Sequence, residues 1–315
     1  MAVLMAPGGT LQMAAGALDH GADSVYVGPH GWSRRPASDE LSDAEIRELI
    51  EHGRSGGKDV RIAINVMPAP DEIGCFLDKV GRYAAWGAGG VMLCDPGCIR
   101  LVRERVPGIE IHVSVTAGLF NSEDIRVYRQ LGADHVVLPY RWGSAEIAEA
   151  KGRTGIALEA FLFETPQRSW ICPGRCHASS YFRIDHACDE QGKDHFVGSA
   201  GRGGSCHRIC QGRWNFRSGT ELLTGARQLK SSPELLLWEL PDYVEVGVSR
   251  FKIPGRERSV ELVCAITAFY RRALDHVLRG SRDLSGFLPE WSDIKARWVS
   301  ERSHRDDRRV GAAAA

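Results

Sequence analysis

The chain has 315 residues, of which 43% are hydrophobic, so it can bury a large core as one domain or as two. Lysine plus arginine and aspartate plus glutamate both number 40, and this balance excludes the strong overall basic character of many nucleic-acid-binding proteins. No lysine or arginine precedes Arg34, and no apolar run approaches about 20 residues. We therefore expect no secretory signal, no membrane span, a cytoplasmic location and no nucleic-acid partner.

Eight short apolar segments recur along the chain, with helix-like segments between them. They are rich in valine, isoleucine and leucine and alternate little with polar residues, as is typical of strands buried on both faces. The eight segments are 2–7, 24–29, 61–66, 90–96, 111–115, 135–139, 157–163 and 250–255. Strands that alternate with helices in this way predict a (β/α)8 TIM-type barrel, and an open doubly wound sheet is the alternative.

The segments between the expected strands carry helix start and stop signals. Helices are expected to begin at Thr10, at Ser42, and at Asn121 or Ser122, and Glu45 completes a capping box with Ser42. Glycine-containing triplets at 21–23, 87–89 and 132–134 precede strands and indicate left-handed turns after helices. Two further helices are expected over 232–248 and 259–278.

The regular spacing is interrupted once, between the seventh and eighth strands. Residues 164–249 separate Phe163 from Arg250, and this connection starts at the C-terminal end of a strand, where barrel enzymes carry their active sites. We expect a barrel domain over 1–283 that includes a cysteine-rich insertion over 164–230. A C-terminal extension over 284–315 is expected to be a disordered tail from about residue 301. The basic residues of the insertion indicate either a solvated loop or an anion site: Arg202, Arg208, Arg213, Arg217, Arg227 and Lys230.

Five of the nine cysteines lie within residues 172–210. Cys172 and Cys176 form one pair, Cys206 and Cys210 form another, each with a gap of three residues, and Cys188 lies between the pairs. Clustered cysteines in a cytosolic chain favour metal or redox chemistry over disulfides. Two close pairs of thiolates suit a 4Fe–4S cluster, whereas structural zinc sites more often use a two-residue gap. Buried or free cysteines are the remaining alternative.

Other polar residues follow the expected strands. Cys94 and Cys98 are either a redox or ligand pair or small buried residues, and His112 and His135 open strands, which favours a structural role. Seven residues at the strand ends are candidates for binding an anionic small-molecule substrate: Asn65, Ser114, Thr116, Arg141, Glu159, Lys252 and Arg256. No nucleophile–base pattern identifies a catalytic residue.

Several ordered motifs resemble those of the collagenase-like peptidase family U-32. They include "MAPGGTLQMAAGALDHGADSVYVG" near the start, "GRCHASSYF", "CHRICQGRW" and "SRFKIPGRERS". The resemblance is greatest to the UbiU/UbiV-type iron–sulfur members, and it implies an iron–sulfur barrel that takes part in oxygen-independent hydroxylation of a ubiquinone precursor or a related small molecule. It also implies a heterodimer with a paralogous member. A peptidase, or a binding subunit with a structural cluster, are the alternatives.

The resemblance also implies a ligand set for the 4Fe–4S cluster. Cys176, Cys206 and Cys210 match family ligand positions. The family's first ligand lies seven residues before Cys176, where this chain has Ser169. Cys172 is the expected replacement, and Cys188 is held in reserve.

Overall fold

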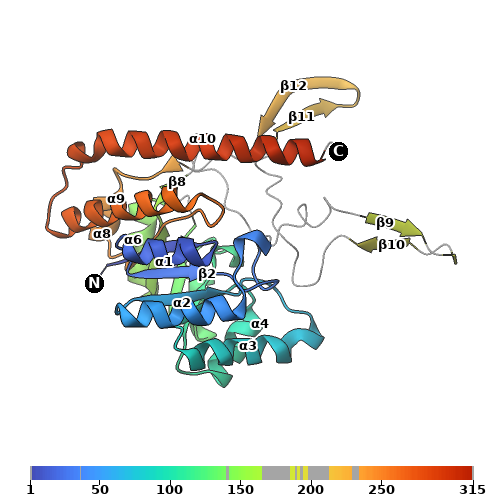
Figure 1. The fold of residues 1–315 in the computed structure, drawn as a ribbon, viewed down its shortest axis with the longest axis horizontal. Coiled ribbons are helices and arrows are strands. Elements are labelled where there is room, and N and C mark those ends of the chain that lie inside the picture. The colour runs from blue at the N-terminus through green and yellow to red at the C-terminus, as the bar shows by residue number, and fades with distance from the viewer. Residues whose placement is uncertain are drawn as a thin grey trace.

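The computed structural model describes residues 2–35, 37–139, 142–164, 185–188, 190–191, 194–197, 213–228 and 234–313. Eight parallel strands close into a barrel in the order β1-β14-β7-β6-β5-β4-β3-β2 (Figure 1), which confirms the TIM-type prediction. The barrel strands are β1 Val3–Gly8, β2 Ser24–Val27, β3 Asp59–Ala63, β4 Gly90–Leu93, β5 Glu110–Val113, β6 His135–Val137, β7 Ala157–Phe161 and β14 Arg250–Lys252. Each lies within or overlaps one of the eight apolar segments.

Helices surround the barrel, and the predicted caps explain where several of them begin. Thr10, Ser42 and Asn121 each accept a hydrogen bond from a backbone N–H of the following first turn, and Glu45 completes the capping box at Ser42. The helices are α1 Leu11–Asp19, α2 Asp43–Ser55, α3 Ile73–Trp86, α4 Pro96–Arg105, α5 Ser122–Gln130, α6 Ser144–Thr154, α8 Leu240–Glu245, α9 Val260–Leu278 and α10 Leu288–Ala313. Short 3-10 turns lie at Ala37–Asp39, Pro70–Glu72, Val115–Ala117 and Ser285–Phe287.

One expected helix is much shorter than predicted. Within 232–248 the chain first forms strand β13, Glu234–Leu235, which pairs with β8, Phe163–Glu164, and only then forms α8. The leucines at 235–237 are all buried, so packing on the core determines their conformation rather than helical periodicity.

The C-terminal segment is helical where the sequence suggested no ordered element. Helix α10 continues to Ala313, through the segment after residue 301 that we expected to be a disordered tail. Its first half packs on the domain, because Ile294 and Trp298 are buried. Figure 1 shows α10 lying along α9, and contacts between the two helices agree with this view.

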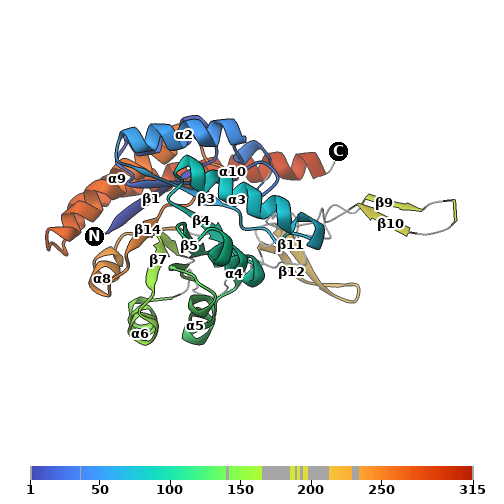
Figure 2. The ribbon, with the colours of Figure 1, turned by 90° about the horizontal axis from the view of Figure 1, so that it is seen from below.

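The long connection between β7 and β14 carries additional strands. Hairpin β9–β10 joins Asp185–Cys188 to Asp194–Val197, and hairpin β11–β12 joins Arg213–Ser218 to Glu221–Gln228. In Figure 2 the chain enters the barrel at the left, where β1 begins, and both hairpins lie at the right. They therefore lie on the side toward which the parallel strands run, as predicted for the insertion.

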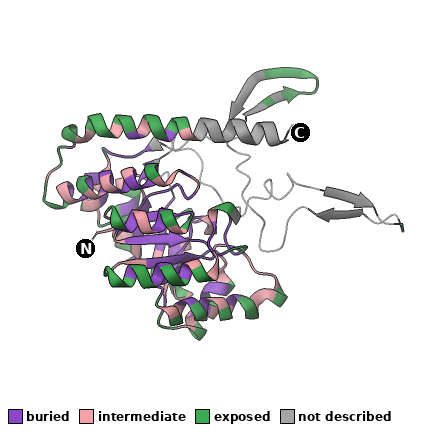
Figure 3. Ribbon diagram, viewed as in Figure 1, coloured by how far each residue is buried: buried purple, intermediate pink, exposed green. Residues whose placement is uncertain are grey.

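The core follows the layers of the barrel. Figure 3 shows buried residues along the strands and exposed residues on the outer faces of the surrounding helices. Outward-facing strand residues such as Val25, Ile62 and Val91 join the large cluster between strands and helices. A second, smaller cluster of Met5, Tyr26, Ala63 and Met92 lies inside the barrel. No described helix is both long enough and apolar enough to cross a membrane.

The glycine that ends α5 provides a test of the predicted left-handed turns. Gly132 has a φ of +102°, and a Cβ there would lie 2.6 Å from the Arg103 side chain. We expect Gly132→Ala to lower the free energy of unfolding by at least about 1 kcal/mol in urea denaturation. Gly152→Ala is the matched control, since Gly152 lies in α6 in open space, and it should raise stability by about 0.5–1 kcal/mol. Equal effects of the two changes would contradict this interpretation of the turn.

Candidate functional site

A buried ion pair joins two neighbouring strands inside the barrel. Lys252 on β14 donates a hydrogen bond from Nζ to Glu159 Oε1 on β7 at 2.8 Å. His112 on β5 lies on the other side of the same carboxylate, with Nδ1 3.1 Å from Glu159 Oε2. Glu159 and His112 are fully buried and Lys252 is almost fully buried. The pair brings together two of the residues predicted to bind substrate.

The surroundings of Lys252 explain how its charge is accommodated. Its ammonium group lies 3.0 Å from Met92 Sδ and 4.2 Å from the centre of the Tyr26 ring, whose face attracts cations. Burial lowers the pKa of Lys252, and Glu159 opposes this effect. Burial alone would raise the pKa of Glu159, but Lys252 and His112 hold it well below its ordinary value. The carboxylate is therefore ionised at neutral pH.

A second ionic group lies nearer the N-terminal ends of the strands. Arg61 Nη1 and Arg250 Nη2 both contact Glu110 Oε2, at 2.7 and 3.2 Å. Arg61 also pairs with Asp59 at 2.5 Å. Glycines provide the space for this arginine, because a Cβ on Gly90 would lie 2.3 Å from Arg61 Nη1. The space for the Arg61 side chain on β3 is thus provided by a glycine on the neighbouring strand β4.

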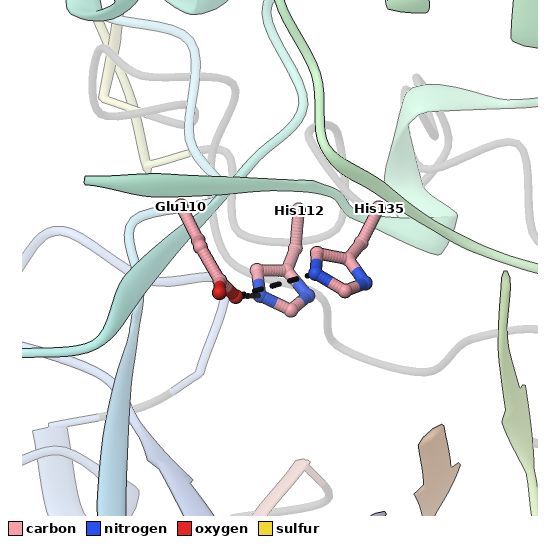
Figure 4. Close-up of side chains that lie close together, drawn as sticks. All are labelled: Glu110, His112 and His135. Atoms are coloured by element: carbon pink, nitrogen blue, oxygen red, sulfur yellow. Dashed lines mark ion pairs between the residues drawn. The ribbon is translucent and has the colours of Figure 1, made fainter. Parts of the chain in front are cut away.

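Two histidines connect these ionic groups. The rings of His112 and His135 stack in parallel, with centroids 4.3 Å apart and an interplanar angle of 6°. Glu110 Oε2 lies 3.2 Å from His135 Nε2 and 3.7 Å from His112 Nε2 (Figure 4). Both imidazoles, followed by the two arginines, hold the pKa of Glu110 far below its ordinary value, whereas burial lowers the pKa of His135. His135 is therefore neutral at pH 7.

The trio of Glu110, His112 and His135 has the residue types of a metal site. One ligand atom from each lies within 4.8 Å of the others. The geometry argues against an ion, because parallel stacked rings direct their in-plane lone pairs side by side rather than toward one point. Arg61 and Arg250 also already place positive charge on the same carboxylate oxygen. We interpret the trio as part of the ionic network.

At the C-terminal end of the barrel, Arg256 lies close to the loop that follows β2. Its Nη1 donates a hydrogen bond to Ser33 Oγ at 3.2 Å, and its guanidinium lies 5.8 Å from the centre of the Tyr26 ring. The Tyr26 hydroxyl donates to the carbonyl of Ile253 at 3.0 Å. Burial and the nearby charge of Arg35 lower the pKa of Arg256 to about 10, so it remains a cation at pH 7.

Three other predicted residues form a separate polar group. Thr116 Oγ1 donates to Ser114 Oγ at 2.9 Å, and Asn65 Nδ2 lies 3.5 Å from the same oxygen. The Oδ1 atom of Asn65 is buried without a hydrogen-bond partner. Ser114 is thus held by an amide and a hydroxyl, and among the described residues no histidine contacts it as a general base would.

Some predicted site residues lie outside the described part of the chain. These are Arg141 and the expected cluster ligands Cys172, Cys176, Cys206 and Cys210. Cys188 lies at the end of β9, of which the backbone is described, opposite Asp194.

The "CDPGC" cysteines fit the packing interpretation. Neither Cys94 nor Cys98 forms a disulfide with a described cysteine, and both are buried. Burial, with Asp95 nearby, raises the pKa of Cys98 to about 12, so this thiol is protonated at neutral pH and is a poor nucleophile or redox group.

Sequence reasoning missed most members of the ionic network. Tyr26, Arg61, Glu110 and Arg250 were not among the predicted site residues. The sequence signal that could have identified them is a charged or polar residue within a segment that is otherwise typical of a buried strand. Such a side chain needs a polar partner inside the barrel. His112 and His135, expected to be structural, lie at the centre of that network.

Removing the cation of the buried pair should strongly destabilise the fold. Lys252→Met leaves the Glu159 carboxylate buried and uncompensated, and we expect a loss of about 3–5 kcal/mol in the free energy of unfolding, measured in urea at pH 7. The double variant Lys252→Met/Glu159→Gln should recover part of this loss. Arg47→Met is the control, because its pair with Glu51 is exposed and should be worth less than about 1 kcal/mol. A loss below 1 kcal/mol in Lys252→Met would contradict the role of the pair.

The lowered pKa of Glu159 also predicts a dependence of stability on pH. The unfolded chain takes up a proton near the ordinary glutamate pKa of about 4.3, whereas the folded carboxylate resists protonation. The stabilisation is therefore present above this pH and is lost as the pH falls below it. We expect Glu159→Gln to show a shallower decline between about pH 5 and pH 3 than the wild type, in thermal unfolding followed by circular dichroism. Parallel declines in the two proteins would exclude this carboxylate as a source of the effect.

Several of the known proteins that this chain resembles are named for RNA modification. It is 25% identical to tRNA hydroxylation protein P1 of Bacillus subtilis over 86% of this chain and 63% of that protein. It is also 25% identical to the 23S rRNA 5-hydroxycytidine C2501 synthase of Escherichia coli, over 90% of this chain and 40% of that protein. The chain thus spans less than two thirds of the length of either relative.

A solved structure and a family model complete the comparison. A putative dihydrodipicolinate synthetase from Pseudomonas aeruginosa superimposes with a TM-score of 0.50 at 10% identity, covering 93% of this chain and 80% of that one, and it shares the fold alone. The family model described as peptidase family U32 matches residues 9–306. This match covers nearly the whole chain, including seven of the eight barrel strands and the cysteine-rich insertion, and the chain therefore belongs to peptidase family U32.

Proposed function

We propose that this protein is an iron–sulfur barrel that takes part in a hydroxylation reaction. The observation that carries the proposal is the similarity to relatives of which several are named for hydroxylation of tRNA or rRNA. The oxygen-independent character of the reaction comes from the sequence resemblance and belongs to the proposal. The specificity for a ubiquinone precursor rests on that resemblance alone, because the relatives reported above are named for RNA.

The position of the insertion supports this function. The insertion leaves the barrel at β7 and returns at β14, and these two strands are direct neighbours in the sheet. The same strands carry Glu159 and Lys252, whose ion pair lies inside the barrel. A cofactor held by the insertion would therefore be attached at the end of the barrel where Arg256 places positive charge.

The proposed cofactor is a 4Fe–4S cluster bound by Cys172, Cys176, Cys206 and Cys210, with Cys188 as the reserve ligand. The chemistry of the donor set fits it, because four thiolates in two close pairs on one insertion can converge on a cluster. When bound, the cluster would supply one-electron transfer to the reaction. The barrel residues would bind and orient the substrate beside it.

The substrate is proposed to be an anionic small molecule, and an RNA base is the second candidate. The buried cations at the mouth favour an anion, whereas the names of the relatives favour RNA. A peptidase is less well supported, because among the described residues Ser114 is paired with Thr116 and Asn65 rather than with a base. The heterodimeric partner and the cytoplasmic location remain part of the proposal.

Anaerobic purification tests the cofactor. We expect a brown protein with about four iron and four sulfide ions per chain. Its absorption in the visible region should decrease when the cluster is reduced. A colourless protein that takes up no iron after anaerobic reconstitution with iron and sulfide would contradict the proposal. Zinc bound in place of iron under the same conditions would identify a structural zinc site instead.

Separate substitutions identify the fourth ligand. Cys172→Ala and Cys188→Ala should differ, since the true ligand loses the cluster and the other cysteine does not. Cys75→Ala is the matched control, because Cys75 is a free, exposed cysteine on α3. Full iron content in both insertion variants would show that the fourth ligand is neither of them.

A further inference from the structure

Arg34 and Arg256 are buried arginines that form no ion pair with a described residue. Arg34 is 5% exposed and Arg256 is 6% exposed. The hydrogen bond of Arg256 goes to the neutral hydroxyl of Ser33, and Nη1 of Arg34 has no hydrogen-bond partner. Neither arginine takes part in an ion pair with a described residue. Both positive charges are therefore buried without an ion-pair partner among the described residues.

The other two buried arginines of the described chain, Arg61 and Arg258, have closer partners. Arg61 forms ion pairs with Asp59 and Glu110. Arg258 stacks on the Trp298 ring at 3.9 Å and donates to the Trp298 carbonyl. A buried charge without such partners costs several kcal/mol of solvation. A negatively charged ligand would supply the missing partner of the unpaired arginines.

Both arginines lie at the C-terminal end of the barrel. Arg34 follows β2 and Arg256 follows β14, and these strands are the two neighbours of β1. The two loops touch through Ser33, which accepts the hydrogen bond from Arg256. Glycines fix this contact, because a Cβ on Gly28 would lie 2.3 Å from Arg256 Nη1 and one on Gly9 would lie 1.8 Å from the Arg256 carbonyl oxygen. The position of Arg256 is therefore set by the backbone.

The nearby carboxylates are occupied or do not reach Arg256. Glu40 accepts hydrogen bonds from the backbone N–H groups of Gly31 at 2.7 Å and Ser33 at 3.0 Å, so its charge holds the loop in place. Glu40 and Glu257 both favour the charged form of Arg256, but neither forms an ion pair with it in the described chain. Arg35 adds further positive charge beside Arg256. The balance of the cluster at this end of β1, β2 and β14 is cationic.

We propose that the mouth of the barrel holds an oxyanion-binding site built on Arg256, with Arg34 of the adjoining loop as its second cation. The ligand is a carboxylate or phosphate group, since the planar guanidinium binds both through paired hydrogen bonds. The site deepens the proposed function, because it would hold the charged end of a substrate while the rest of it lies toward the insertion. It rests on the proposal that this end of the barrel receives the substrate.

Calorimetric titration and thermal unfolding of the full chain test the site, with inorganic phosphate, succinate and a short oligoribonucleotide as probes. We expect at least one probe to bind and to raise the unfolding temperature, and Arg256→Met and Arg34→Met each to weaken its binding by roughly tenfold or more. Without a probe, both variants should unfold at the same temperature as the wild type or higher, because each removes an unpaired buried charge. Arg47→Met, on the exposed face of α2, is the control and should change neither property.

The probes distinguish the source of the oxyanion. Binding of succinate alone indicates a carboxylate substrate, whereas oligonucleotide binding that inorganic phosphate displaces indicates a nucleic-acid phosphate. Binding of no probe, or equal binding by the wild type and both variants, would overturn the site. A large drop in the unfolding temperature of Arg256→Met without a probe would also overturn it, by showing that a protein group already neutralises that arginine. None of these readouts depends on the cluster, so failure of the site and failure of the proposed cofactor can be told apart.

Discussion

The need to neutralise charge inside a closed barrel is the constraint on which the rest of this structure depends. The interior of a TIM barrel is ordinarily filled by layers of apolar side chains. Here Glu159 and Lys252 meet inside it, with His112 beside them. Each charge is tolerated because a partner of opposite sign lies within hydrogen-bonding distance. Strand register determines which side chains meet inside the barrel. The ionic network therefore depends on correct closure of the barrel, and the closed barrel depends on the network to neutralise its buried charges.

The network extends through most of the length of the barrel. It begins at Glu110, which binds two arginines near the N-terminal ends of the strands, and continues through the stacked histidines to Glu159 and Lys252. A hydrophobic interior of similar volume is often as stable as a buried ion pair or more so. Stability alone therefore does not explain why the barrel interior carries this network. The insertion attaches to the same two strands that carry the central pair.

Local sequence signals predicted the fold well, because they act over short distances. Capping residues such as Ser42 and Asn121, and the apolar strand segments, depend on a few neighbouring residues. The partners in the ionic network are far apart along the chain. His112 and Glu159 are separated by 47 residues. Glu159 and Lys252 are separated by 93 residues. Which charged residues meet depends on strand order and on the inward or outward direction of each side chain. The sequence therefore identified Glu159 and Lys252 as candidates but not as a pair, and it missed Glu110 and Arg61.

Arg256 and Lys252 lie on one motif but differ in whether the protein neutralises their charge. Both belong to the "KIPGR" segment and both are buried. Lys252 points into the barrel and forms an ion pair with Glu159, so its charge is neutralised within the chain. Arg256 is fixed by Gly9 and Gly28 but has only a hydroxyl as its hydrogen-bond acceptor among the described residues. A rigidly held cation without an ion-pair partner is preorganised for an anion. When the anion binds, the cation is already in place and already removed from water, so binding does not have to provide the free energy for either change.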